Sequence, residues 1–70
     1  IELTIPIGAP VVNKTLNDIP LPKGTLVGAI MRGDQVIIPS GDDVIKVDDR
    51  LTLFTIPENI SRIGDFFESK

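Results

Sequence analysis

The spacing of apolar and polar residues at the start of the chain predicts a β-strand with one buried face. Polar residues separate apolar ones at every second position, which is the period of a strand. Pro6 interrupts this pattern and has no N–H to give to a sheet, so we expect the strand to lie at an edge or to end there. The apolar members of the pattern are Ile1, Leu3, Ile5 and Ile7.

Two further strands are predicted on either side of a tight turn at Gly33 and Asp34. Residues 25–32 form the run TLVGAIMR, in which no charged residue interrupts positions 26–31, so we expect a central strand whose two faces are both partly covered. The turn then returns residues 36–38 as the antiparallel arm of a hairpin, which Pro39 ends. Alternation predicts one face with Leu26, Gly28 and Ile30, and another with Val27, Ala29 and Met31.

Capping and turn residues predict where the remaining short helix and the last strand begin and end. Thr15 is placed to cap a short helix over residues 16–19. Turn signals at 41–43 and 48–49 flank a short extension at 44–45, and residues 51–56 read as the last strand.

A C-terminal helix is predicted from Pro57, because proline suits a first helical position and Glu58 suits the positive end of the helix dipole. Its apolar residues recur at about helical spacing, at Ile60, Ile63, Phe66 and Phe67. The predicted fold is therefore α+β, a small and mostly antiparallel β-sheet with a short helix after the first strand and a C-terminal helix.

Size and charge narrow the possible functions. A chain of 70 residues forms one domain with a small core, and without cysteine or histidine neither a disulfide nor a zinc site supports it. We therefore expect a homodimer. The net charge of −3 argues against nucleic-acid binding, and no apolar run has the length of a membrane span. Because Ile1 already lies in a patterned strand, we expect a fragment of a longer protein, and the absence of cysteine fits the reducing cytoplasm.

Residues 8–15 match a phosphate-binding P-loop except at Asn13, where the second glycine belongs. Pro10 removes one of the backbone N–H groups that cradle phosphate, and no helix of sufficient length follows. The chain is also too short for the parallel α/β sheet that carries such a loop. We interpret the segment as a turn that leads into a short capped helix.

Acidic residues raise the question of a calcium or magnesium site, but their spacing fits no EF-hand loop. Each lies beside a turn signal, where aspartate is locally favoured, so solvated turn residues are the simpler interpretation. The residues concerned are Asp34, Asp42, Asp43, Asp48 and Asp49. No histidine, cysteine or activated hydroxyl offers a nucleophile or a base, so we expect no catalysis, no metal and no cofactor in this domain.

Arg32 is the residue with the clearest candidate chemistry. It lies at the mouth of the hairpin, facing the return strand, where its guanidinium could bind phosphate in a bidentate manner over an apolar floor. The alternative is a solvated arginine at the end of a strand, paired with Asp34 or Asp49. Residue properties alone favour this second interpretation.

The order of several short motifs resembles the RCK-C domain family, also called TrkA-C. The segment that carries the resemblance runs from Leu21-Pro22 and Gly24-Thr25 through Val27-Gly28-Ala29-Ile30, Arg32-Gly33, Ile37-Ile38-Pro39 and Gly41-Asp42 to Asp49. Upstream, residues 12–16 resemble the Val-Gly-Lys-x-Leu of that family. Asn13 replaces its glycine, and Asp48 stands where the family commonly has glycine.

The resemblance implies that residues 1–70 are a regulatory domain of a potassium or other cation transport system, most like a Trk-type regulatory subunit. In some members cyclic di-AMP binds at the dimer interface, and the matching positions here are Arg32, Asp34, Ile37, Ile38 and Pro39. The implied partner is a membrane-embedded transporter subunit, which would hold the protein at the inner face of the cell membrane. The alternatives are a structural dimerisation or docking module without a ligand, and the regulatory domain of an antiporter.

Overall fold

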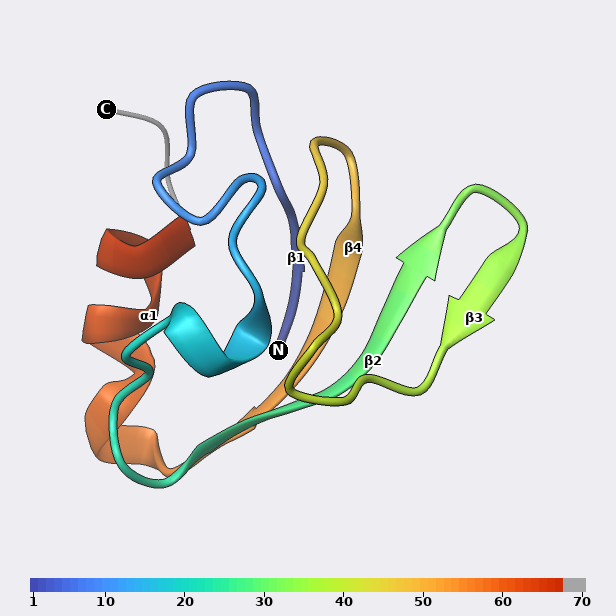
Figure 1. Cartoon of the computed structure of the whole chain (residues 1–70). Coiled ribbons are helices and arrows are strands. Elements are labelled where there is room, and N and C mark those ends of the chain that lie inside the picture. The colour runs from blue at the N-terminus through green and yellow to red at the C-terminus, as the bar shows by residue number, and fades with distance from the viewer. Residues whose placement is uncertain (68–70) are drawn as a thin grey trace.

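Four antiparallel strands form one sheet with the order β1-β4-β2-β3 (Figure 1). The computed structural model describes residues 1–67. Its strands are β1 (Glu2–Thr4), β2 (Thr25–Arg32), β3 (Gln35–Ile37) and β4 (Arg50–Thr55), and its helices are η1 (Leu16–Asp18), η2 (Pro57–Asn59) and α1 (Ile60–Phe67). The predicted α+β fold is therefore confirmed, and β2 is a central strand as expected.

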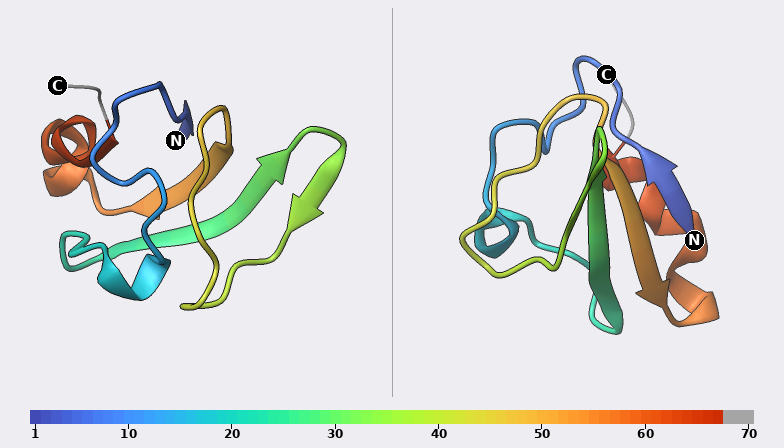
Figure 2. Two further views of the ribbon diagram at one scale, coloured as in Figure 1. Left: turned by 45° about the horizontal axis from the view of Figure 1, so that its top comes forward. Right: turned by 90° about the vertical axis from the view of Figure 1, so that its right-hand side faces the viewer.

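One side of the sheet carries the helices and the core. In Figure 1 both α1 and η1 lie to the left of the sheet. In the right panel of Figure 2, where the right-hand side of Figure 1 faces the viewer, the strands lie in front of α1. The buried apolar side chains form one cluster of Ile5, Ala9, Val11, Ile19, Val27, Ile30, Ile45, Leu51, Leu53, Ile63 and Phe67. Among residues 1–67, no helix combines the length and the hydropathy needed to cross a membrane.

The first strand is shorter than the alternation predicts. It ends at Thr4, before Pro6, and Ile7 is 81% exposed while Ile1 is 48% exposed. Only Leu3 and Ile5 of the predicted face pack into or against the core. The prediction for Ile7 is wrong because the proline ends the ladder, so the two-residue period does not continue beyond it. Ile1 is only half-buried because it precedes the first residue of the strand.

A β-bulge in β2 changes which side chains face the core. The register with β4 shifts between Val27 and Ala29, so the extra residue is Gly28. As a result Val27 and Ile30 are both buried, whereas Leu26 is exposed. The predicted grouping of Leu26 with Ile30 is wrong because an inserted residue reverses the alternation beyond it.

Both helical predictions hold, with differences at their ends. The short helix is a single 3-10 turn, and Thr15 at its N-cap makes no side-chain hydrogen bond to the backbone; its hydroxyl donates instead to Asp18 Oδ2 at 3.0 Å. The C-terminal helix begins with Pro57 as a 3-10 turn and continues as α1. Ile63 and Phe67 are buried, but Ile60 is exposed, because it begins α1 on the solvent side. The side chain of Phe66, also predicted for this face, lies outside what the structure describes.

Asn59 fastens the start of this helix to the sheet. Its side chain is buried and its Nδ2 donates to the carbonyl oxygen of Lys23 at 2.7 Å and to Thr25 Oγ1 at 3.3 Å. A buried amide stabilises a fold only when it is hydrogen-bonded, and both donors here reach partners at the start of β2. The polar contact therefore fixes the direction in which the chain leaves the sheet.

Candidate functional site

The β2–β3 hairpin carries most of the predicted ligand-binding residues. Arg32 pairs with Gln35 across the turn and Ile30 pairs with Ile37, so Arg32 and Ile37 share the inner face of the sheet. Ile37 packs against the core, whereas Ile38, just beyond the strand, is 79% exposed.

The two remaining predicted residues lie on either side of this pair. Asp34 is exposed at the tip of the turn, and Pro39 is partly buried beyond Ile38. The hairpin thus gathers the five residues into one region but does not place them all on one face.

Arg32 forms a bidentate ion pair with Asp49 at the start of β4. Nε donates to Oδ1 at 2.8 Å and Nη2 donates to Oδ2 at 2.7 Å, while Nη2 also donates to the carbonyl oxygen of Val44 at 2.9 Å. These bonds use Nε and both hydrogens of Nη2. Within residues 1–67, no hydrogen bond from Nη1 accompanies them, and 37% of the side chain remains exposed.

Asp49 is far more enclosed than the turn signal around it predicts. Its side chain is 1% exposed, and Oδ2 also accepts a hydrogen bond from the backbone N–H of Lys46 at 2.9 Å. Burial by itself raises the pKa of this carboxyl, but the hydrogen bonds from Arg32 and Lys46, with the attraction of their charges, lower the pKa below its ordinary value. Asp49 is therefore a structural carboxylate and not a solvated turn residue, and the expectation of solvation is wrong for this position.

The other acidic residues do not gather around Asp49. In the described part of the chain, no group of three or more acidic residues is arranged to hold a metal ion. Asp43 instead closes its own turn, since its Oδ2 accepts a hydrogen bond from the backbone N–H of Ser40 at 2.7 Å. This local bond is what the turn signal predicts for an aspartate.

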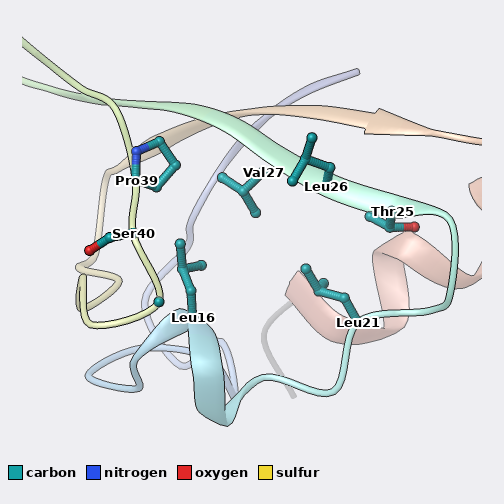
Figure 3. A pocket seen from close by; sticks show the side chains of 8 residues that line it. Leu16, Leu21, Thr25, Leu26, Val27, Pro39 and Ser40 are labelled. Carbon is teal, nitrogen blue, oxygen red and sulfur yellow. The ribbon is translucent and has the colours of Figure 1, made fainter.

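A pocket of about 210 Å³ opens between η1, the first half of β2 and the segment that follows the hairpin (Figure 3). Figure 3 shows Leu16 directed toward Val27 across the pocket, with Leu21 on one side and Pro39 on the other. The lining residues are Leu16, Leu21, Thr25, Leu26, Val27, Pro39, Ser40 and Gly41. Pro39 belongs both to this pocket and to the predicted ligand-binding set.

The backbone of Val27 adds polarity to this apolar pocket. Leu53, opposite Val27, exchanges both of its backbone hydrogen bonds with Ile1, at 2.7 and 3.0 Å. Because the bonds of an antiparallel ladder alternate in direction, the N–H and C=O of Val27 point away from β4.

On that side β3 pairs only with Ile30–Arg32, and no bond outside the ladders reaches Val27 within residues 1–67. A buried backbone group requires a hydrogen-bonding partner. The pocket therefore offers one donor and one acceptor to a bound molecule or to solvent.

The sequence did not point to this pocket. Leu16 and Leu21 belong to a segment predicted only as a turn and a short helix, and the alternation of side chains predicts nothing about the backbone groups of Val27. The short length of the predicted returning strand does indicate that part of the neighbouring strand is left unpaired. Residues 36–38 can pair with only one end of an eight-residue strand, which leaves an unpaired edge over the other end.

Comparison with known proteins assigns the chain to a family. The model of the TrkA-C domain matches residues 1–68, nearly the whole sequence. The chain belongs to the TrkA-C domain family.

Relatives of this TrkA-C domain include two potassium uptake proteins. It is 45% identical over 56 residues to the Trk system potassium uptake protein TrkA homolog of Archaeoglobus fulgidus, and the match covers 80% of this chain and 13% of the relative. It is 41% identical over 59 residues to the Trk system potassium uptake protein TrkA of Azorhizobium caulinodans, and this match covers 84% of the chain and 13% of the relative. The chain thus spans about an eighth of the length of these relatives.

The fold of this TrkA-C domain has a close match among solved structures. An RCK domain described as solved with cda superposes with a TM-score of 0.84, covering 97% of this chain and 96% of the other at 22% identity. At this identity the match establishes the shared fold.

Proposed function

We propose that residues 1–70 form the regulatory C-terminal domain of a Trk-type potassium uptake protein, in which two copies associate and bind cyclic di-AMP between them. Membership of the TrkA-C family and similarity to potassium uptake proteins support the regulatory role. The RCK domain of the same fold that is described with cda supports the ligand. The longer protein would act at the inner face of the membrane, through a transporter subunit that carries the ion.

The observation that carries the ligand site is the exposed apolar surface that runs from the hairpin into the pocket. Val36 and Ile38 are 64% and 79% exposed, and Pro39 continues the surface into the pocket lining. A base placed there would bury its faces against leucine and proline side chains. The backbone N–H and C=O of Val27 match the acceptor and donor that an adenine presents side by side on one edge.

Arg32 and Asp34 carry opposite charges and would therefore contact different groups of the ligand. Nη1 of Arg32 is the donor available to a phosphate oxygen. Asp34 is exposed and can only accept hydrogen bonds when ionised, so it suits a hydroxyl or amino group of the ligand and not its phosphates. A two-fold dimer would present this arrangement twice to a two-fold symmetric dinucleotide, which supports binding at the interface.

Regulation follows if the ligand binds one arrangement of the two copies more tightly than another. A shift in the distance or angle between the copies would then be passed to the transporter. A structural dimerisation module without ligand is the second candidate, and the observation that favours it is the engagement of Arg32 with Asp49.

Titration calorimetry with cyclic di-AMP, combined with sedimentation at several protein concentrations, tests the proposal. We expect binding at one dinucleotide per two chains, and we expect Ile38→Ser to weaken it. Ile7→Ser is the matched control, because Ile7 is equally exposed but lies away from the hairpin. A chain that stays monomeric, or that produces no heat at saturating ligand, would contradict dimerisation or ligand binding respectively.

A further inference from the structure

We propose that Asp49 is the positioning residue for Arg32, fixing the guanidinium so that only Nη1 is presented to a phosphate oxygen of the bound nucleotide. This inference rests on the ligand site proposed above. Asp49 lies outside the proposed ligand site, and it contacts Arg32 but not the ligand.

Asp49 is itself held from three directions. Its carbonyl oxygen accepts a hydrogen bond from Ile5 N–H at 2.9 Å, its own N–H donates to Lys46 at 3.2 Å, and its side chain accepts one from Lys46 N–H. A carboxylate anchored in this way is a rigid support for the side chain of Arg32, which it binds. Arg32 therefore cannot swing toward a ligand without breaking two charge-assisted bonds.

The same contact limits what Arg32 offers. The fork of Nε and Nη2 is occupied by Asp49, with the second Nη2 hydrogen on Val44, so a ligand oxygen meets the free edge at Nη1. The carboxylate also offsets the charge of the guanidinium. Recognition would depend on a hydrogen bond from a correctly positioned Nη1 more than on net charge. The arginine side chain is already ordered in the free protein, so binding costs little further side-chain entropy.

Charge and position make opposite predictions for Asp49→Asn. This variant removes a negative charge next to the phosphate site, so a site that works by charge would bind cyclic di-AMP more tightly. A site that works by position would bind it more weakly, because an amide has only one acceptor oxygen and cannot form the two parallel bonds to the guanidinium. We expect the dissociation constant to rise about tenfold or more, in line with the loss of a charge-assisted bidentate contact.

Asp43→Asn is the matched control. Asp43 acts on Arg32 through charge but makes no hydrogen bond to it among the described residues. We expect this variant to bind cyclic di-AMP as the wild type does, or slightly more tightly. Each variant is measured below its melting temperature, so that lost stability does not enter the dissociation constant.

Arg32→Lys keeps the inference testable if Asp49→Asn does not fold. Lysine retains the positive charge but cannot make the forked contact, so we expect a similar loss of affinity. A side-chain NMR signal from Arg32 Nε–H gives a readout without ligand: it should exchange slowly with water in the wild type and rapidly in Asp49→Asn.

The possible outcomes separate the two proposals. If the wild type binds no cyclic di-AMP, the proposed function fails and this inference falls with it. If the wild type binds but Asp49→Asn binds equally well or better, the function stands and the positioning role of Asp49 is overturned. Weaker binding by Asp49→Asn and Arg32→Lys, with Asp43→Asn unchanged, supports it.

Discussion

Among residues 1–67, two residues other than glycine adopt backbone angles that favour glycine. The φ angles of Asn13 and Asp48 are +68° and +70°, in the left-handed region where a side chain is disfavoured. These are the two positions at which the resemblance to the TrkA-C family leads us to expect glycine. The departure therefore changes the residue and keeps the turn, because Asn and Asp tolerate this conformation better than other side chains do.

We expect Asn13→Gly and Asp48→Gly each to stabilise the domain by about 0.5–1 kcal/mol, since glycine adopts these angles without steric cost. Asp48→Ala should destabilise it by about 1 kcal/mol for the opposite reason. Urea unfolding followed by circular dichroism measures these changes. Asp42→Gly is the control, because its φ is negative and glycine there should only add freedom to the unfolded chain.

Asp49 gives the domain a defined sensitivity to acid. Its pKa is lower in the folded protein than in the unfolded chain, so its contribution is complete above the unfolded value of about 4. It is lost progressively as the pH falls below that value and through the folded pKa. We expect Asp49→Asn to cost about 2–4 kcal/mol at pH 7 and less at pH 3, which lies below the unfolded pKa. Urea unfolding of both proteins across this range checks the expectation, and an equal cost at both pH values would contradict it.

Residue properties could narrow the partners of Arg32 but could not choose between them. Asp34 is two positions away, whereas Asp49 is distant in sequence and was expected to be solvated. The choice depends on register: Met31 pairs with Arg50, which brings Arg32 opposite Asp49. Burial of the Asp49 carboxylate depends in turn on residues 44–48, which close over it. The alternation of apolar and polar residues does not predict the path of that segment.

Among the elements, the strands and the C-terminal helix could be predicted from periodicity, but the faces of the central strand could not. Gly28 is the reason, because a bulge inserts one residue that the alternation counts as regular. A Cβ at Gly28 would overlap Phe54 Cε2. Phe54 pairs with Leu26 across the ladder, and its ring occupies the space above the glycine.

Helix α1 should stabilise the fold through one stripe of its surface. Ile63 is 2% exposed and packs in the core, whereas Ile60 is 54% exposed one turn earlier. We expect Ile63→Ala to destabilise the domain by about 2–4 kcal/mol through lost burial and the cavity that remains. Ile60→Ala, the same substitution in the same helix, should change the free energy of unfolding by less than about 0.5 kcal/mol. Comparable losses in both variants would mean that α1 packs differently.

At the scale of the whole molecule, the sheet joins the first strand of the chain to the last one. β1 pairs with β4 through Glu2↔Thr52, Leu3↔Leu51 and Thr4↔Arg50, and Ile5 enters the core directly afterwards. We expect removal of residues 1–5 to abolish cooperative unfolding, since it uncovers one edge of β4 and empties a core position. Differential scanning calorimetry of the shortened chain would detect this as the loss of its transition. A sharp transition that survives would show that β2, β3 and β4 suffice.

The pairing of β1 with β4 also bears on how the protein is made. About fifty residues separate the paired positions, so closing this loop costs chain entropy before the contacts that reward it can form. On the ribosome, β1 has no partner until β4 has emerged from the exit tunnel. During that interval the apolar residues in and next to β1 stay exposed to chaperones and proteases, for a time that the rate of translation determines.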